Sequence, residues 1–297
     1  ILLEPRLGFN YRTGSDNQIQ VRGGTGVFTG KPPYVWVSNQ VGNNGILTGF
    51  IQADNSRDYR FTPNVSEFIP STPTLPTSFD IAATDNNYKF PQVWKSDLAL
   101  DYRLPFGAIA TVELMYNKNV NAVRYFDANL EPAADTAKFK GPDSRSRFPG
   151  SYVSGSLVSA ANRVNDNVVR AAVMTTTDEG YYRALTLKLE WPNWRGLSAM
   201  LAYTRSEAKD LMSAGSIASG SFTGLRTVEG NNKPVLSWSD YDIPHRLIGY
   251  LGYRQEYGGE RGGATQVYLS YAGAQSERYS YVYAGDMNGD GIQNNDL

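Results

Sequence analysis

The sequence predicts an all-β protein, and more specifically a transmembrane antiparallel β-barrel. Three observations favour this fold class: strand-length runs that alternate between polar and apolar residues, short turns that join the runs in pairs, and long connections between the pairs. Only 19% of the residues are charged, whereas ~25% is usual for a soluble domain. Aromatic residues make up 12%, and Tyr is the commonest of them. This balance suits strands that place one face in an apolar environment.

Four pairs of alternating runs predict four hairpins. In the run 94–104, Leu98, Leu100 and Tyr102 share one face, while charged residues occupy the other. The predicted hairpins join 94–104 to 108–116, 183–191 to 197–206, 245–257 to 265–271, and 6–12 to 18–28. Because alternation on both sides of a tight turn is typical of an antiparallel pair, we expect about eight strands.

The two ends of these hairpins differ in a way that indicates an outer-membrane barrel. The turns within pairs are short, whereas the connections 31–90, 121–178 and 208–243 are long and rich in Pro, Ser, Asn and Gly. Outer-membrane barrels combine short periplasmic turns with long extracellular loops, and compact soluble domains seldom carry several such loops. We therefore expect these three connections to be extracellular. The alternative is a soluble or surface all-β module for calcium-dependent binding or adhesion.

Composition also excludes several function classes. The chain has no Cys and a single His, His245, so neither a disulfide framework nor a Cys- or multi-His metal centre is available. A formal net charge of −1 argues against a nucleic-acid partner. A Gly-x-Ser-x-Gly nucleophile elbow is absent as well. We expect no catalytic residues, and hence no enzyme.

The segment 286–296 contains the start of an EF-hand-type calcium loop. Its candidate ligands are Asp286, Asn288, Asp290, the carbonyl of Ile292, and Asp296. Acidic and amide residues fall at positions 1, 3 and 5, and Gly291 occupies position 6, where the loop turns sharply. The acid expected at position 12 is replaced by Leu297, and Asp296 stands one position earlier. Both a Ca²⁺ site and an ordinary extracellular turn remain open, and no other cofactor is expected.

Five segments carry a family resemblance: 4–11, 22–36, 203–210, 239–246 and 285–291. The most specific are Thr-Gly-Lys-Pro-Pro-Tyr-Val-Trp at 29–36 and Asp-Ile-Pro-His-Arg at 242–246. Together they resemble the C-terminal part of the β-barrel of TonB-dependent outer-membrane receptors, in particular the Oar-like receptors of Bacteroidetes. The resemblance extends over the whole length of the chain.

This resemblance implies a 22-stranded barrel in the bacterial outer membrane, of which residues 1–297 would form one part. The plug domain and the TonB box of the family are not in this sequence. The implied function is TonB-dependent uptake of a nutrient or peptide ligand, without covalent chemistry. The implied partners are outer-membrane lipid, the TonB complex acting through an N-terminal part, and a surface lipoprotein.

Three aromatic residues in the first long connection are candidates for ligand binding. Tyr34, Trp36 and Tyr59 could stack on a ligand from an extracellular loop. Anchoring of the loop by the same side chains is the alternative.

Overall fold

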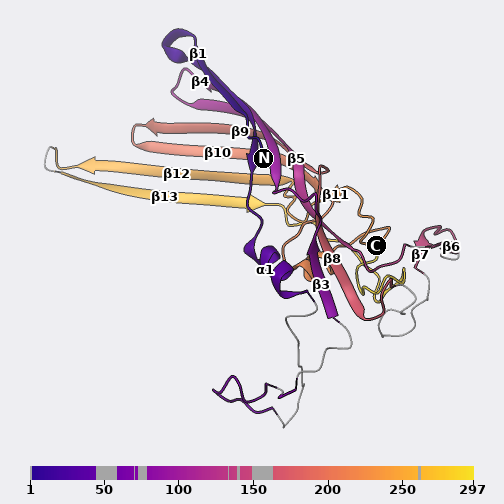
Figure 1. The fold of residues 1–297 in the computed structure, drawn as a ribbon. Coiled ribbons are helices and arrows are strands. Elements are labelled where there is room, and N and C mark those ends of the chain that lie inside the picture. Colours follow the sequence, from indigo (N-terminus) through magenta and orange to yellow (C-terminus); the bar gives the residue numbers. More distant parts are fainter. Residues whose placement is uncertain are drawn as a thin grey trace.

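Long antiparallel strands form one end of the molecule, and shorter elements and loops form the other (Figure 1). The structure is a computed structural model that describes residues 2–44, 59–69, 71–72, 79–132, 134–138, 141–148, 163–259 and 262–297. The first and second predicted loops, 31–90 and 121–178, therefore lie partly outside the described residues.

Eight strands follow one another in a continuous antiparallel path. They are β1 (Arg6–Thr13), β2 (Ile19–Thr29), β4 (Gln92–Arg103), β5 (Ile109–Asp127), β9 (Tyr181–Trp194), β10 (Leu197–Asp210), β12 (His245–Tyr257) and β13 (Gly263–Ala274). Each pairs with the next in this order, which confirms the four predicted hairpins. Among the described strands, β1 and β13 are the two edges of this path, so the sheet does not close on itself.

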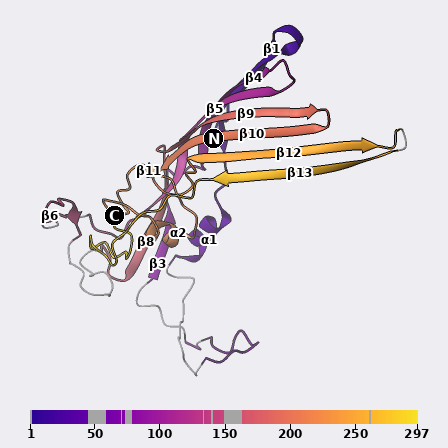
Figure 2. The ribbon, with the colours of Figure 1, turned by 180° about the vertical axis from the view of Figure 1, so that it is seen from behind.

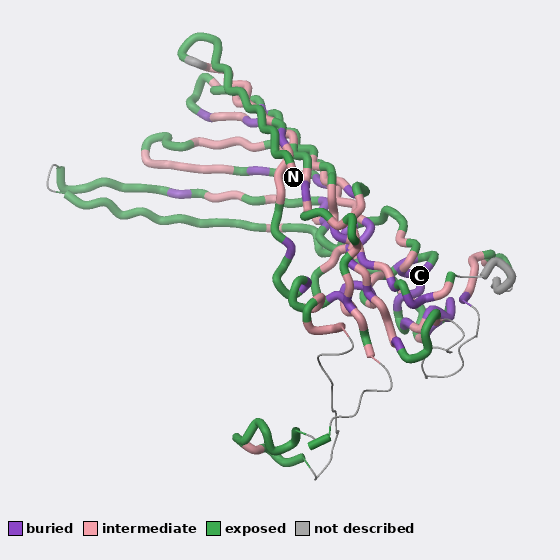
Figure 3. The backbone as a smooth tube through the Cα atoms, in the orientation of Figure 1, coloured by how far each residue is buried: buried purple, intermediate pink, exposed green. Residues whose placement is uncertain are grey.

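The strand register turns the sequence alternation into two chemically different faces. Leu98 lies opposite Leu114, and Leu114 lies opposite Leu185, so these three residues point to the same side of the sheet. We call this side the apolar face. Leu98 is 47% exposed and Leu114 is 53% exposed. Figure 3 shows β12 and β13 largely green and the neighbouring strands mainly in the colours of exposed and intermediate residues. A face of exposed leucines is what contact with lipid requires.

The opposite side, which we call the polar face, is held together by ion pairs across strands. The Arg22 guanidinium donates to Asp101 on the neighbouring strand at 2.9 Å and to Glu113 at 3.3 Å. The Thr111 hydroxyl donates to the same Asp101 carboxylate at 2.6 Å. In a barrel with lipid outside, this face lines the lumen.

The short turns depend on residues that tolerate a left-handed backbone. Arg195 has φ 53° and Gly196 has φ 83° in the turn between β9 and β10. A Cβ atom at Gly196 would also collide with the Arg254 carbonyl oxygen of β12. Only glycine therefore satisfies both the turn and the close approach of the next strand.

The predicted long loops carry secondary structure that the sequence analysis did not anticipate. Beyond Lys118, β5 no longer pairs with β9. From Ala122 to Asp127 it pairs instead with β8 (Val168–Thr177), which pairs in parallel with β3 (Phe79–Thr84). β5 is therefore 19 residues long. The other described elements are η1 (Ser15–Asn17), α1 (Tyr34–Gly42), β6 (Ala134–Lys138), β7 (Ser146–Arg147), α2 (Ala218–Thr223) and β11 (Ser237–Trp238). Of the described helices, none is long and apolar enough to cross a membrane.

The buried protein core sits at the loop end of the strands rather than between them. Figure 2 shows α1, α2, β3 and β8 gathered there, and Figure 3 shows buried positions concentrated at this end. Tyr125 and Phe222 are fully buried, and Trp36 meets Tyr125 edge-on at 6.1 Å between ring centroids. The cluster consists of Trp36, Ala82, Val123, Tyr125, Ala172, Met174, Met212, Ala218, Phe222 and Ile292. We call this assembly the loop body.

Candidate functional site

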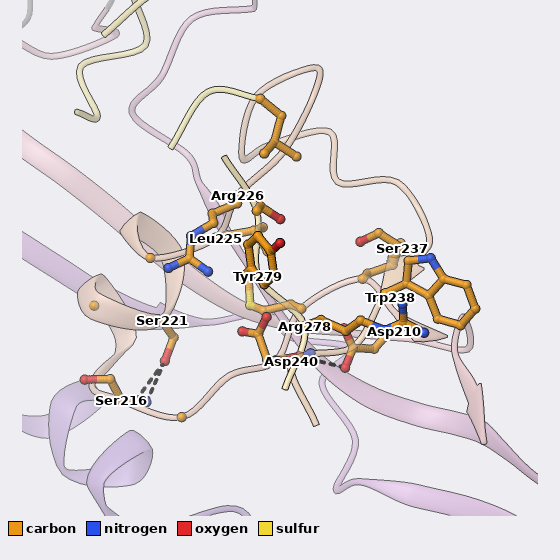
Figure 4. A pocket seen from close by; sticks show the side chains of 18 residues that line it. Asp210, Ser216, Ser221, Leu225, Arg226, Ser237, Trp238, Asp240, Arg278 and Tyr279 are labelled. Carbon is orange, nitrogen blue, oxygen red and sulfur yellow. Dashed lines mark hydrogen bonds between the residues drawn. The ribbon is translucent and has the colours of Figure 1, made fainter. Parts of the chain in front are cut away.

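A pocket of about 480 Å³ opens in the loop body beside the end of β10. Its wall combines the end of β10 and the chain that follows it, α2 and the residues after it, β11, and the segment after β13 (Figure 4). The polar and aromatic lining residues that matter most are Asp210, Arg226, Trp238, Asp240, Arg278 and Tyr279. These elements are distant in sequence, and the neighbouring positions of β10, β12 and β13 in the sheet bring them together.

Two serine hydroxyls fix the carboxylate wall of the pocket. The Asp210 carboxylate accepts hydrogen bonds from the Ser239 hydroxyl at 2.6 Å and from the Ser213 hydroxyl at 2.9 Å. The backbone N–H of Asp240 donates to the Ser213 hydroxyl oxygen at 3.1 Å. The wall therefore presents an acceptor whose position is set before a ligand arrives.

The cationic and aromatic wall is equally constrained. Arg278 donates through Nε to the buried carboxylate of Asp242 at 2.8 Å, and its guanidinium lies 4.2 Å from the centre of the Trp238 ring. The ammonium group of Lys209 lies 4.8 Å from the same ring. Both distances fall within the range of cation–π attraction. Trp238 and Arg278 thus hold each other at the edge of the pocket.

The remaining groups suit recognition of a polar ligand by hydrogen bonds. Tyr279 is 78% exposed, and Figure 4 shows its ring between Arg226 on one side and Trp238 on the other in this view. A tyrosine ring offers an apolar surface and one hydroxyl. A fixed carboxylate, a fixed guanidinium and serine hydroxyls supply both donors and acceptors around it.

The structure separates the three aromatic residues that were candidates for ligand binding. Tyr34, the first residue of α1, is 80% exposed, and Tyr59 is 48% exposed with its ring on Phe68 at 5.2 Å. Trp36 is only 6% exposed, and its indole N–H donates to the Ser216 carbonyl at 2.7 Å. None of the three is among the residues that line the pocket beside β10.

Sequence reasoning did not single out the pocket residues. Asp210, Trp238 and Asp240 fall within the predicted loop 208–243, but nothing in their spacing indicated a shared site. Arg278 follows a different hairpin. The only available signal was the order of the predicted strands, which places the ends of β10 and β12 next to each other.

The candidate calcium segment is buried against the loop body. The Asp286 carboxylate accepts hydrogen bonds from the backbone N–H groups of Gly289 at 2.7 Å and Gly291 at 2.8 Å. Asp290 accepts from the N–H of Ile292 at 2.8 Å, and Asp296 accepts from that of Met287 at 2.7 Å. The candidate ligands Asp286, Asn288, Asp290, Ile292 and Asp296 are all 7% exposed or less. The carboxylates thus hold the turn in its shape through backbone amides.

Burial disfavours the charged form of Asp286 and Asp290. It raises the pKa of Asp290 to about 7, and the nearby carboxylates of Asp286 and Asp296 add to the rise. The pKa of Asp286 is also raised, mainly by burial. In the described part of the chain, no group of three or more His, Cys, Asp and Glu side chains is arranged to hold a metal ion. Calcium binding at this segment therefore stays a prediction.

Comparison with known proteins identifies the family. No curated protein matches the chain. A family model described as an outer membrane beta barrel domain matches residues 2–271, which is most of the sequence. The match agrees with the eight-stranded antiparallel path, its exposed apolar face and its ion-paired polar face. The chain therefore belongs to the outer membrane β-barrel domain family and is a protein of the bacterial outer membrane.

Proposed function

We propose that this chain is part of a TonB-dependent receptor of the Oar-like kind, which takes up a nutrient or peptide ligand without covalent chemistry. The observation that carries the proposal is the pocket beside β10, because it combines fixed polar groups from distant segments at the loop end of a barrel wall. Ligand sites are typically concave, with a few placed polar groups. The sequence resemblance to TonB-dependent receptors supports the same function.

The polar face supports a route inward from this pocket. Arg22, Asp101 and Glu113 form a charged network on the lumen side of β2, β4 and β5. In the proposed receptor, the plug closes the lumen and the TonB complex, acting through the N-terminal part of the protein, supplies the energy to open it. Polar walls then keep a hydrophilic ligand solvated as it passes.

A surface lipoprotein is the proposed extracellular partner. The segment after β13 presents Tyr279, Tyr281 and Tyr283, which are 78%, 86% and 57% exposed. Tyr279 and Tyr281 meet edge-on at 5.6 Å. Exposed tyrosines at the rim of a ligand pocket are typical of protein-binding surfaces, since each combines a large apolar ring with a hydroxyl.

We also propose Ca²⁺ as a structural ligand of the segment 286–296. The specific observation in its favour is the burial of Asp286, Asp290 and Asp296 within one short turn, because buried carboxylates require compensation. A bound Ca²⁺ would neutralise these carboxylates and so stabilise the turn that they hold. Terbium luminescence, excited through nearby tyrosines in the full-length protein, would report binding. Loss of the signal in Asp286→Asn is expected, and no signal in the wild type at neutral pH would contradict the proposal.

Uptake can be tested in cells that carry the full-length protein. We would supply a defined mixture of short peptides and a defined mixture of oligosaccharides, and follow depletion of each component by mass spectrometry. Depletion of a peptide subset is expected in the wild type and not in cells that lack TonB or the receptor.

Arg278→Ala should slow depletion at least tenfold, because it removes the fixed guanidinium. Arg254→Ala is the control, because Arg254 lies near the end of β12 that is far from the pocket. Equal depletion with and without TonB would contradict the proposed mechanism.

A further inference from the structure

Four charged side chains line the pocket beside β10, and one of them is neutralised within the described part of the chain. They are Asp210, Arg226, Asp240 and Arg278. Arg278 forms an ion pair with Asp242 at 2.8 Å. Among the described residues, the Arg226 guanidinium and the Asp240 carboxylate have neither a hydrogen bond nor an ion pair. Both residues are exposed, so water solvates these two charges until a ligand covers them.

Asp210 supplies a second carboxylate beside that of Asp240. The hydroxyls of Ser213 and Ser239 both donate to the same oxygen of Asp210, Oδ2. The other oxygen, Oδ1, accepts no hydrogen bond from the residues that the structure describes, and it keeps some access to solvent. The Ser213 hydroxyl oxygen also accepts a hydrogen bond from the backbone N–H of Asp240 at 3.1 Å, so one serine holds both aspartates on the same wall. A cation at this wall therefore meets two carboxylates.

The charges of the pocket match a ligand that carries both an ammonium group and a carboxylate. An ammonium group has three N–H donors and suits the wall formed by Asp210 and Asp240. A carboxylate suits the planar guanidinium of Arg226, which offers paired N–H donors. Figure 4 shows the Tyr279 ring between Arg226 and Trp238 in this view, and this ring adds an apolar surface. A short peptide with free ends carries both charges and side chains that can contact such a ring.

Other small polar ligands fit these charges less well. A neutral oligosaccharide would displace water from Arg226 and Asp240 without supplying an opposite charge to either. A polyamine would match the aspartates but would leave Arg226 without an acceptor, and the aspartates would repel a dianion. The cavity of about 480 Å³ has the size of a small-molecule site, which limits the peptide to a few residues.

We propose that the pocket binds a short peptide through its two free ends. The α-ammonium group lies between Asp210 and Asp240, and the terminal carboxylate contacts Arg226. The Tyr279 ring packs against a side chain between these ends. This inference rests on the proposed receptor function and names the class of ligand that the receptor selects. The charges at the ends of the peptide, rather than the identity of its side chains, then dominate selection.

Native mass spectrometry of the full-length protein in detergent tests this assignment. The probe is an equimolar mixture of the tripeptides Ala-X-Ala, in which X is each uncharged amino acid and both ends are free. Acetylation of the amino ends replaces the ammonium group by a neutral amide and should weaken binding about tenfold or more. Amidation of the carboxyl ends removes the anion that contacts Arg226 and should weaken binding by a similar factor.

Substitutions in the pocket should duplicate these effects. Asp240→Asn should weaken binding of the free tripeptides about tenfold, and acetylation should then cause little further loss. Arg226→Gln should relate to amidation in the same way. Both substitutions alter exposed side chains, so we expect both variants to fold. Glu229→Gln, which alters an exposed carboxylate outside the pocket lining and close to Arg226 in the sequence, is the matched control and should bind as the wild type does.

The outcomes separate this inference from the proposed receptor function. Equal binding of free and acetylated tripeptides by the wild type would overturn recognition of the ends, and so would stronger binding of a defined mixture of neutral oligosaccharides. In the uptake assay, TonB-dependent depletion of free and acetylated peptides at equal rates would leave the receptor function standing and overturn this inference. Selective binding of the free tripeptides without TonB-dependent depletion would support this inference and contradict the proposed uptake.

Discussion

Arg205 and His245 contact each other across β10 and β12 on the apolar face of the sheet. Arginine can only donate hydrogen bonds, so Nε2 of His245 accepts and Nδ1 carries the proton. Nδ1 then donates to the Tyr203 hydroxyl oxygen at 2.6 Å. The single histidine of the chain therefore links the Tyr203 hydroxyl to the Arg205 guanidinium on the apolar face.

The first prediction concerns this link. His245→Leu removes both hydrogen bonds. It should lower the free energy of unfolding by up to about 1 kcal/mol for each bond that is lost. The midpoint of heat-induced unfolding, followed by electrophoretic mobility in detergent, measures the change. Tyr203→Phe serves as the second arm of a double-mutant cycle. If Tyr203 and His245 interact, the two losses should be less than additive.

The second prediction separates the two faces of one strand. Leu187 lies on the apolar face opposite Val112 and Tyr203, and it is 47% exposed. Leu187→Arg places a cation in lipid near the middle of β9 and should cost about 2–4 kcal/mol at the midplane of the bilayer. Equilibrium unfolding of the folded barrel in lipid vesicles by guanidinium measures the cost.

The matched control for that prediction is the adjacent residue. Thr186 points to the polar face, where its hydroxyl meets the Thr204 hydroxyl at 3.0 Å. Thr186→Arg should change stability much less than Leu187→Arg, since its side chain enters the lumen. Equal destabilisation by both variants would contradict the assignment of the faces.

The eight barrel strands could be predicted from the sequence because lipid imposes a simple rule. Where one face meets hydrocarbon and the other meets water, the alternation of period two is visible in each strand, as in Leu98 and Leu100 of β4. Register then follows from matching apolar rows across short turns. No tertiary information was needed for these elements.

The loop body could not be predicted in the same way, because its structure depends on distant contacts. Residues 34–42 are rich in Val and aromatic residues, which favour strands, yet they form the helix α1. Burial of Trp36 against Tyr125 overrides the local preference. Likewise β5 continues to Asp127 only because β8 pairs with it there.

The candidate pocket was unpredictable for a related reason. Asp210 and Arg278 lie on different hairpins, and their positions depend on Ser213, Ser239 and Asp242 as well. Such hydrogen bonds leave no periodic signature in a sequence. By contrast, the sequence could single out the segment 286–296 as a candidate because its ligand-type residues are local and regularly spaced.

The third prediction distinguishes ligand stacking from loop anchoring at Trp36. Because Trp36 is buried in the core of the loop body, Trp36→Ala should lower the local stability of this body by about 3–5 kcal/mol. Limited proteolysis should then cut the loops faster while the strands remain protected. Tyr34→Ala, two residues away and 80% exposed, is the control and should leave the cleavage rate unchanged. Unchanged cleavage in Trp36→Ala would contradict the anchoring role.

The fourth prediction concerns the pH dependence of the segment 286–296 in the absence of divalent metal. Burial and two neighbouring carboxylates raise the pKa of Asp290 from 3.8 to about 7. Between these values the folded segment binds a proton that the unfolded segment lacks, so its stability falls as pH rises through this range. The contribution of Asp290 is fully present below pH 3.8 and is lost above about pH 7.

Hydrogen exchange of the backbone amides of Gly291 and Ile292, corrected for the intrinsic pH dependence of exchange, measures this local stability. Protection should decrease between pH 5 and pH 8 in the wild type with chelator present. Asp290→Asn should flatten the profile, because an amide does not titrate, whereas Asp240→Asn alters an exposed carboxyl and should not. If Ca²⁺ binds here as proposed, its addition at pH 8 should restore protection in the wild type but not in Asp290→Asn. A profile with the same slope in the wild type and in Asp290→Asn would refute the role of Asp290.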